Sequence, residues 1–218
     1  MMKDFQKIRL RELLNPYLAP FRRLGLKTDK FTIISNNCWG GHVYRYFGIP
    51  YLSPTIGLYF FADDYLRFIK KLNYYLSLEL KFIKHEESKY YTILVERGGR
   101  DAICPIGKLD DLEIIFLHYG SEQEAFEKWT RRSKRIVWNT IVYKMSDQNM
   151  CTDELLVEFD KLNINRKFCF VSKDLGLKSQ VLFKEYFGSE EVRNDTTLFR
   201  KYIKLASFIN GKPFKKRQ

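Results

Sequence analysis

FTIISNNCWGGHVYRYFGIPYLSPTIGLYFF, residues 31–61, decides the fold because it contains a short β-branched run that ends abruptly in a polar loop. The run is Phe31 to Ile34, and the loop is residues 35–41, SNNCWGG. A buried strand that ends among polar side chains is typical of α/β proteins, where ligands bind at the carboxyl ends of the strands. No other segment has so many reactive or hydrogen-bonding groups, so we expect the functional site here.

Predicted strands and helices alternate along most of the chain. Apolar and β-branched runs predict strands at about 30–35, 90–96, 112–117, 139–144 and 167–171, and an edge strand at 181–187. Helical spacing of apolar residues predicts helices at about 3–26, 41–47, 62–78, 121–137, 152–162 and 195–209. The alternation indicates βαβ units. We therefore predict an α/β fold with three α/β/α layers around a largely parallel, or mixed, central sheet.

Cap and breaker residues set the expected limits of these helices. Pro16 and Pro20 each remove a backbone donor, so we expect them to interrupt the first helix. The expected N-terminal caps are Asp63 or Asp64, Ser121 with Glu124 as a capping box, and Thr152 or Asp153.

One domain is predicted for residues 1–218, because no linker, repeat or low-complexity tract divides them. Residues 1–27 are predicted to be a helical segment packed on this domain, and residues 210–218 a basic tail. The N-terminus lacks the apolar core of a signal peptide, and no window has the roughly 18 apolar residues that a membrane-spanning helix needs. We expect a cytoplasmic protein, located at the inner face of the membrane if its basic ends meet anionic lipid.

The net charge of +12, from 38 basic and 26 acidic side chains, favours an anionic partner such as nucleic acid, acidic lipid or a phosphorylated metabolite. The four cysteines are far apart in the sequence and form neither a C-x-x-C pair nor a Cys/His cluster with zinc-like spacing. Free thiols and no metal site are therefore predicted. The sequence does not predict an oligomeric state.

Polar side chains follow four of the predicted strands. If these strands are parallel, their carboxyl ends share one edge of the sheet, which brings together Cys38, His118, Asp147 and Asp174. A thiol, an imidazole and a carboxylate make an activated nucleophile, in which the base removes the proton and the acid fixes the tautomer. Cys38 is predicted to be the nucleophile or a substrate-positioning residue, and His118 the base. Which aspartate would support His118 stays open.

The loop around Cys38 adds possible hydrogen-bond donors. Backbone N–H groups after Gly40 and Gly41 are expected to lower the thiol pKa and to form an oxyanion site, with Asn36 and Asn37 as further donors. The alternative is structural. A lone cysteine is more often a small buried hydrophobe than a nucleophile, and a histidine at a strand end is often bound to backbone.

A second cluster lies in the helix predicted at 121–137. Trp129, Arg132 and Arg135 lie within two turns, and arginine forks suit a phosphate because they bind in a bidentate manner and stay charged. The alternatives are a solvated basic face or an internal ion pair of Arg132. The turn Ser53-Pro54-Thr55 offers two hydroxyls but is a weaker signal, since such a sequence usually forms only a turn.

These motifs together resemble an uncharacterised bacterial family whose members are commonly labelled exopolysaccharide biosynthesis proteins. The resemblance rests on SNNCWGG at 35–41, SPT at 53–55, His118-Tyr119, and Trp129 with Arg132 and Arg135, and it covers roughly residues 28–205. It implies a setting in surface-glycan synthesis and the location of a site, but no reaction. The Asn-Cys pair after the first strand is also similar to capsule-modifying enzymes proposed as acyltransferases.

The leading hypothesis is therefore an enzyme of surface-polysaccharide assembly, an acyl or related group transferase. Its partners would be a glycan acceptor and an anionic donor, such as a coenzyme A ester or a sugar nucleotide. The alternatives are a nucleic-acid-binding protein, which lacks a recognisable motif here, and a non-catalytic scaffold at the membrane surface. The predicted site residues are Cys38, His118 and Asn37 as catalytic residues, and Asn36, Trp39, Gly40, Gly41, Ser53, Thr55, Trp129, Arg132 and Arg135 as ligand-binding residues.

Overall fold

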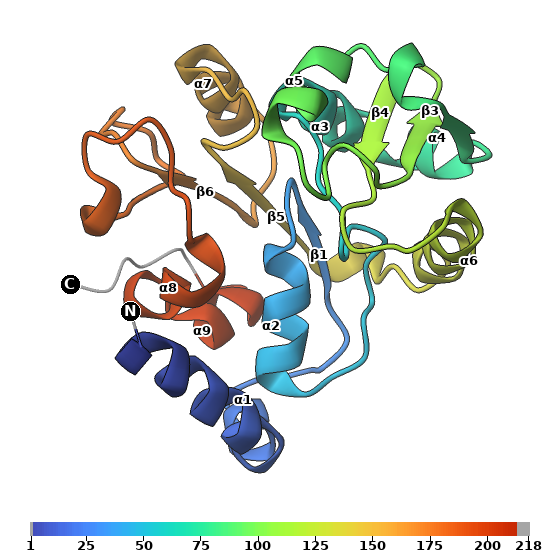
Figure 1. The fold of residues 1–218 in the computed structure, drawn as a ribbon. Helices are drawn as coiled ribbons and strands as arrows, with labels where there is room; N and C mark the ends of the chain where they lie inside the picture. The colour runs from blue at the N-terminus through green and yellow to red at the C-terminus, as the bar shows by residue number, and fades with distance from the viewer. Residues whose placement is uncertain (1, 213–218) are drawn as a thin grey trace.

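A four-stranded parallel sheet, in the order β1-β5-β6-β7, forms the centre of the computed structural model, which describes residues 2–212 and the side chains from residue 13 onward (Figure 1). The strands are β1 Thr32–Ser35, β5 Ile141–Ser146, β6 Lys167–Val171 and β7 Gln180–Leu182. All three neighbouring pairs are parallel, with Thr32 opposite Ile141 and Cys169 opposite Gln180. The predicted α/β class is confirmed.

Helices cover both faces of this sheet because apolar side chains alternate along its strands. Ile33 and Phe168 face α2 Trp39–Phe47, α8 Asp195–Tyr202 and α9 Leu205–Ile209. Ile34 and Cys169 face the other core, which contains α3 Ala62–Lys70, α6 Glu122–Ser133 and α7 Asp153–Lys161. Successive residues of a strand point to opposite faces, so each strand contributes to both cores. The result is the predicted three-layer arrangement.

A separate antiparallel sheet contains β2 Lys81–Ile83, β3 Ile106–Leu109 and β4 Leu112–Ile115. The strand expected at 112–117 was placed among the parallel strands, and that placement is wrong. Its nearly continuous apolar sequence has another cause: β4 lies between two cores, with Ile114 in the larger one and Ile115 packed against Tyr59 and Leu94 in a smaller one.

Residues 90–96, predicted as a strand, form the helix α5 Tyr91–Arg97 instead. Leu94 is its only buried residue, so this short helix lies on the surface with one side chain in the small core. Bonds made just before it position its first turn: Ser88 donates to the Glu113 carboxylate, and so does the Lys89 N–H. The strand prediction failed because it relied on β-branched residues, whose propensity tertiary contacts override.

The N-terminal helix α1 runs without a break from Met2 to Arg23, with Pro16 and Pro20 inside it, so the predicted interruption is wrong. It packs against α2 (Figure 1). The helix predicted at 62–78 is divided at Lys71 into α3 and α4 Leu72–Ser77. The remaining elements are 3-10 turns: η1 His85–Glu87, η2 Trp138–Thr140 and η3 Lys184–Tyr186.

Two of the three predicted N-terminal helix caps are confirmed. Ser121 accepts a bond from the Glu124 N–H, and Thr152 from the Leu155 N–H. At α3 the predicted aspartate cap is wrong, because Phe61 precedes the helix and makes no side-chain cap bond. Asp64 is buried and accepts from Lys89 Nζ at 2.6 Å and from the Glu113 N–H at 3.0 Å.

Within residues 2–212 no helix is both long and apolar enough to cross a bilayer. Residues 213–218 of the predicted basic tail lie outside the described residues.

Candidate functional site

Cys38 lies at the carboxyl end of β1, as the residue before the first turn of α2. Its thiol is half-buried and donates to the Leu58 carbonyl, with Sγ 3.7 Å from that oxygen. Burial and the nearby charge of Asp195 raise the pKa of Cys38 to about 12. The prediction that this loop lowers the thiol pKa is therefore wrong, and at pH 7 roughly one Cys38 in 100,000 is a thiolate.

The amides at the start of α2 are also not available as an oxyanion site, contrary to expectation. Trp39 N–H donates to Asn37 Oδ1 at 3.1 Å, and Gly40 N–H donates to the Ser35 hydroxyl at 3.3 Å. Gly41 N–H donates to the Cys38 carbonyl at 3.1 Å. Each amide already has an acceptor from the chain itself, so an oxyanion would have to displace one.

Trp39, Gly40 and Gly41 allow α2 to pack closely on the sheet. Trp39 is fully buried, with its ring 5.3 Å from Phe168 between centroids, so no ligand reaches it in this conformation. A Cβ on Gly40 would lie 3.2 Å from Ile33 Cγ2, and a Cβ on Gly41 3.3 Å from Ile56 Cγ2. Gly41 also lines a cavity described below.

A buried polar network lies beneath Cys38 and includes residues that the sequence did not reveal. Lys144 is fully buried, and its Nζ donates to Asp195 Oδ2 at 2.5 Å and to Asn37 Oδ1 at 3.0 Å. Asn37 Nδ2 in turn donates to Asp195 Oδ2 at 2.9 Å. Burial lowers the pKa of Lys144, and Asp195 opposes that shift. Asn36 is buried beside this group and accepts from Lys144 at 3.3 Å. The predicted amides thus fix a buried ion pair.

One cavity next to Cys38, of about 410 Å³, is lined by an unusually basic set of side chains, and we call it the basic cavity. Its basic residues are His42 and Arg45 from α2, His118 from the loop after β4, and Lys128 and Arg132 from α6. None of its lining residues, all within the described part of the chain, is acidic. Lys128 is already paired with Glu124. Positive charge in a concave site attracts anions.

His118 lies at the rim of the basic cavity, exposed, with its backbone N–H bonded to the Gly57 carbonyl at 2.9 Å. The partial burial of its ring and the charges of Arg100 and Arg45 lower the pKa of His118 from its usual value of 6.5. The ring is therefore mainly neutral at pH 7 and able to accept a proton. Cys38 and His118 line the same cavity, as expected, but His118 comes from the antiparallel sheet and not from the parallel edge.

Both candidate aspartates hold nearby backbone groups. Asp147 accepts from the Ser172 N–H at 2.7 Å and from the Val192 N–H at 2.8 Å, one on each oxygen. Asp174 Oδ1 accepts from the Gly176 N–H at 3.1 Å, within the turn before β7. A thiol–imidazole–carboxylate triad is therefore not assembled in this conformation.

The residues predicted on α6 separate into three positions. Trp129 belongs to the large core. Arg132 is buried, donates from Nη1 to the Tyr119 hydroxyl at 2.6 Å and to the Ile56 carbonyl at 3.3 Å, and lines the basic cavity. Arg135 is exposed beyond the end of α6 and does not line that cavity. The predicted two-arginine clamp is not formed.

The hydroxyls of the SPT turn are structural in this conformation. Thr55 Oγ1 accepts from the Ser35 N–H at 3.1 Å and donates to the Ile33 carbonyl at 3.3 Å. Ser53 Oγ lies 3.1 Å from Thr55 Oγ1, and both residues are fully buried. The turn therefore attaches the segment after α2 to β1.

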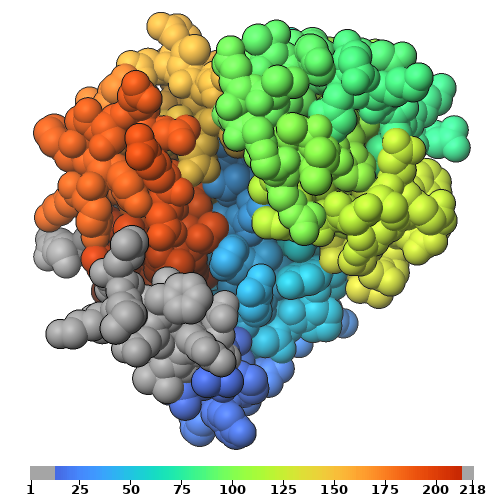
Figure 2. Space-filling model, in the orientation of Figure 1, coloured from blue at the N-terminus to red at the C-terminus, as the bar shows by residue number. Residues whose placement is uncertain are grey.

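A second cavity, of about 350 Å³, lies on the other side of Cys38 and is more mixed in charge. Asp195 and Arg193 line it, together with Tyr59, which donates to Asp101. Figure 2 shows the blue segment that contains α2 set back between the green segment and the orange-red C-terminal segment. Within residues 2–212, no group of three His, Cys, Asp or Glu side chains is arranged to hold a metal ion.

Comparison with known proteins identifies relatives but no activity. The family model described as a domain of unknown function, DUF1919, matches residues 10–210. An uncharacterized protein of Haemophilus influenzae (strain ATCC 51907 / DSM 11121 / KW20 / Rd) is 34% identical over 178 residues, which cover 79% of this chain and 77% of that protein.

Proposed function

This chain belongs to the DUF1919 family, whose model describes a domain of unknown function. We propose that it is a group transferase of bacterial surface-polysaccharide synthesis that uses a phosphorylated donor. The basic cavity would bind the donor, and a glycan or glycan precursor would be the acceptor. The resemblance of its motifs to exopolysaccharide biosynthesis proteins supports the glycan setting.

The observation that carries the proposal is the charge of the basic cavity. Arg45 from α2 and Arg132 and Lys128 from α6 bring positive charge to it, and no acidic residue lines it. Concentrating like charges in one concavity costs stability, because they repel one another at short range. Such an arrangement is expected where an anionic ligand restores the balance, and arginine binds phosphate in a bidentate manner.

The side chains next to that charge suit transfer to a hydroxyl group. In the case of an acyl thioester donor, neutral His118 would accept the proton of the acceptor hydroxyl as its oxygen attacks the carbonyl carbon. The carbon–sulfur bond then breaks, and the proton passes to the leaving thiolate. Cys38 would act through its S–H group as a substrate-positioning residue, since its raised pKa keeps it protonated.

Thermal shift measurements with wild-type protein and matched arginine variants test the donor site. The probes are acetyl-coenzyme A, UDP-glucose and glucose 1-phosphate. A ligand at 100 times its Kd stabilises a protein by about 2.7 kcal/mol, which for a chain of this size raises Tm by roughly 5–10 °C. At least one probe should raise Tm for wild type, for Cys38→Ala and for Arg135→Gln.

The shift should be smaller for Arg45→Gln, because Arg45 is exposed and lines the basic cavity. Arg135→Gln removes the same charge outside the cavity and is the control. If no probe shifts Tm, or if the two variants respond alike, a phosphorylated donor does not bind in the basic cavity and the proposed function is wrong.

A further inference from the structure

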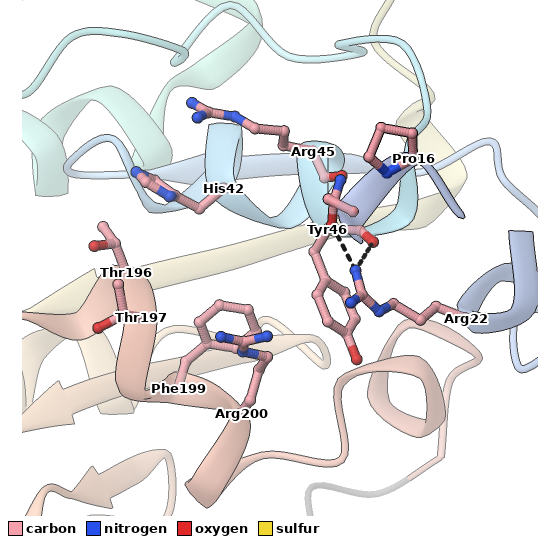
Figure 3. Close-up of a pocket in the computed structure, with 10 residues that line it drawn as sticks. Pro16, Arg22, His42, Arg45, Tyr46, Thr196, Thr197, Phe199 and Arg200 are labelled. Carbon is pink, nitrogen blue, oxygen red and sulfur yellow. Dashed lines mark hydrogen bonds between the residues drawn. The ribbon is translucent and has the colours of Figure 1, made fainter. Parts of the chain in front are cut away.

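A larger cavity, of about 490 Å³, lies between α1, α2 and α8, and we call it the α8 cavity (Figure 3). Its volume lies within the roughly 300–1,000 Å³ typical of small-molecule sites. Arg22, Arg45 and Arg200 give it positive charge, His42 adds an imidazole, and Tyr46 and Phe199 give it aromatic walls. None of its lining residues, all of them described in the structure, is acidic.

Two of these arginines are arranged around one aromatic ring. Arg22 Nη1 donates to Asn15 Oδ1 at 2.6 Å and to the Tyr46 carbonyl at 3.0 Å, and its guanidinium carbon lies 4.2 Å from the Tyr46 ring centroid (Figure 3). The guanidinium carbon of Arg200 lies 5.5 Å from the same centroid. Planar guanidinium groups stack on flat rings and also bind phosphate through paired N–H groups. These walls therefore suit a ligand that combines an aromatic ring with a phosphate.

The α8 cavity and the basic cavity share two residues of α2, His42 and Arg45. With Cys38 they follow the spacing i, i+4 and i+7, which places all three on one face of the helix. From Tyr46 back to Cys38 the helix axis extends about 12 Å at 1.5 Å per residue. One elongated ligand can therefore lie along α2, with one end in each cavity.

We infer that the α8 cavity binds the nucleoside diphosphate part of the donor, with its base against Arg200 and the aromatic walls and its phosphates near His42 and Arg45. This inference rests on the proposed function, because the ligand is the donor of that reaction. Coenzyme A esters and nucleoside diphosphate sugars both contain a nucleoside 5′-diphosphate, so either donor meets the same requirement. The transferred group would then extend toward Cys38 and His118.

Isothermal titration calorimetry with ADP, UDP and pyrophosphate tests this inference on the full chain. ADP or UDP should bind wild type at least tenfold more tightly than pyrophosphate, because only the nucleotides carry a base. Arg200→Gln should weaken nucleotide binding about 3- to 30-fold, as expected when a guanidinium no longer stacks on the base. Arg200→Lys should recover part of the loss, and Arg135→Gln should bind as wild type does. A preference for ADP indicates a coenzyme A donor, and a preference for UDP a sugar nucleotide.

Two results would overturn the inference. If pyrophosphate binds as tightly as the nucleotides, no base is recognised. If the nucleotide affinity of Arg200→Gln is unchanged and its Tm is within 2 °C of wild type, the nucleotide binds elsewhere.

The failure of this inference can be distinguished from failure of the proposed function. If the nucleotides do not bind but glucose 1-phosphate binds, and if Arg45→Gln weakens its binding, the proposed function stands without the α8 cavity. If no phosphorylated probe responds to Arg45→Gln, the proposed function itself is wrong. Circular dichroism of each variant confirms that a lost affinity is not lost folding.

Discussion

At the scale of single residues, the environment of Cys38 favours a protonated thiol. The Leu58 carbonyl accepts its S–H, and the buried carboxylate of Asp195 disfavours a second negative charge nearby. Lys144 acts in the opposite direction but is already bonded to Asp195 at 2.5 Å. Thiolate, and not thiol, is the reactive form of cysteine. To lower the pKa of Cys38, a ligand would have to bring positive charge close to the thiol or reduce the effect of the Asp195 charge on it.

The first prediction concerns the reactivity of this thiol. In native protein at pH 7.5, Cys38 should react with iodoacetamide roughly 1,000-fold more slowly than a cysteine of pKa 9.0, because a pKa of about 12 reduces the thiolate fraction by that factor. Mass spectrometry of the peptide that contains Cys38 measures the rate. Protein unfolded in urea is the control and should react at the ordinary rate. Equal rates in native and unfolded protein would contradict this account of the site.

The second prediction concerns the protonation of His118. Partial burial, together with the charges of Arg100 and Arg45, disfavours the protonated ring, so His118 should titrate below 6.5 by NMR, with His118→Gln used to assign the signal. Removing one of the two charges in Arg45→Gln should raise this pKa toward 6.5, whereas Arg135→Gln should leave it unchanged. If His118 acts as base, the acid limb of the activity profile should shift to higher pH in Arg45→Gln. A His118 pKa above 6.5 in wild type would contradict the described electrostatics.

At the scale of elements, the contact between α1 and α2 determines the shape of the cavities. Asn15, Pro16 and Arg22 of α1 line the α8 cavity, so the position of this helix sets its width. Gly48 ends α2 with φ +61°, and a Cβ there would lie 2.8 Å from Ala19 Cβ on α1. The close approach of the two helices at this point requires glycine.

The third prediction tests this contact with two glycine variants. Gly48→Ala should lower the free energy of unfolding by about 2–4 kcal/mol, from the left-handed conformation and from overpacking against Ala19. Gly99→Ala is the matched control, since Gly99 has φ +54° but no atom within 4 Å of its Cβ position. It should lose only about 1–2 kcal/mol, the conformational part. Urea unfolding measures both, and equal losses would show that the α1–α2 contact is loose.

Local patterns predicted many elements well. The strand at 167–171 has the predicted bounds, and Ser121 begins α6 as its capping box indicated. Errors arose where the deciding contact lies far away in the sequence. Residues 91–97 contain β-branched residues, yet bonds to Glu113 position the start of α5. The apolar sequence of β4 predicts a parallel strand covered by helices on both faces, but a strand buried between two cores has the same apolar pattern.

The candidate site was predicted only in part, for the same reason. The loop at 35–41 was located, because polar residues after a strand are visible in the sequence. Asp195 was not, since its partners Asn37 and Lys144 are 158 and 51 positions away. Lys144 gave a signal that was missed. A lysine inside the central strand of a sheet covered on both faces must be buried, and a buried lysine needs a partner.

At the scale of the whole molecule, the buried pair of Lys144 and Asp195 joins three distant parts of the chain. Lys144 belongs to β5, Asp195 begins α8, and Asn37 precedes α2, and all three meet at the carboxyl end of the sheet. The network therefore holds the C-terminal wall of the cavities against the N-terminal one. We infer that the shape of the proposed donor site depends on this pair.

The fourth prediction is that Asp195→Asn lowers the free energy of unfolding by about 3–5 kcal/mol, the loss expected when one partner of a buried pair is removed. The change keeps the shape of the side chain but leaves the Lys144 ammonium bonded to neutral amide oxygens, such as those of Asn36 and Asn37. Asp153→Asn is the matched control, because Asp153 is likewise the first residue of a helix. Its partner Lys173 is exposed and 3.9 Å away, so it should lose less than about 1 kcal/mol.

The double variant Lys144→Met with Asp195→Leu distinguishes the contribution of the ion pair to stability from its effect on the shape of the cavity. Replacing a buried ion pair with apolar side chains is often neutral or stabilising, so the double variant should recover most of the loss seen in Asp195→Asn. It would nevertheless leave Asn37 with only Gln148 to accept from its amide, which alters the floor of the cavity beneath Cys38. Stability should therefore return while probe binding stays weaker than in wild type. Recovery of both would show that the pair serves folding alone and does not shape the donor site.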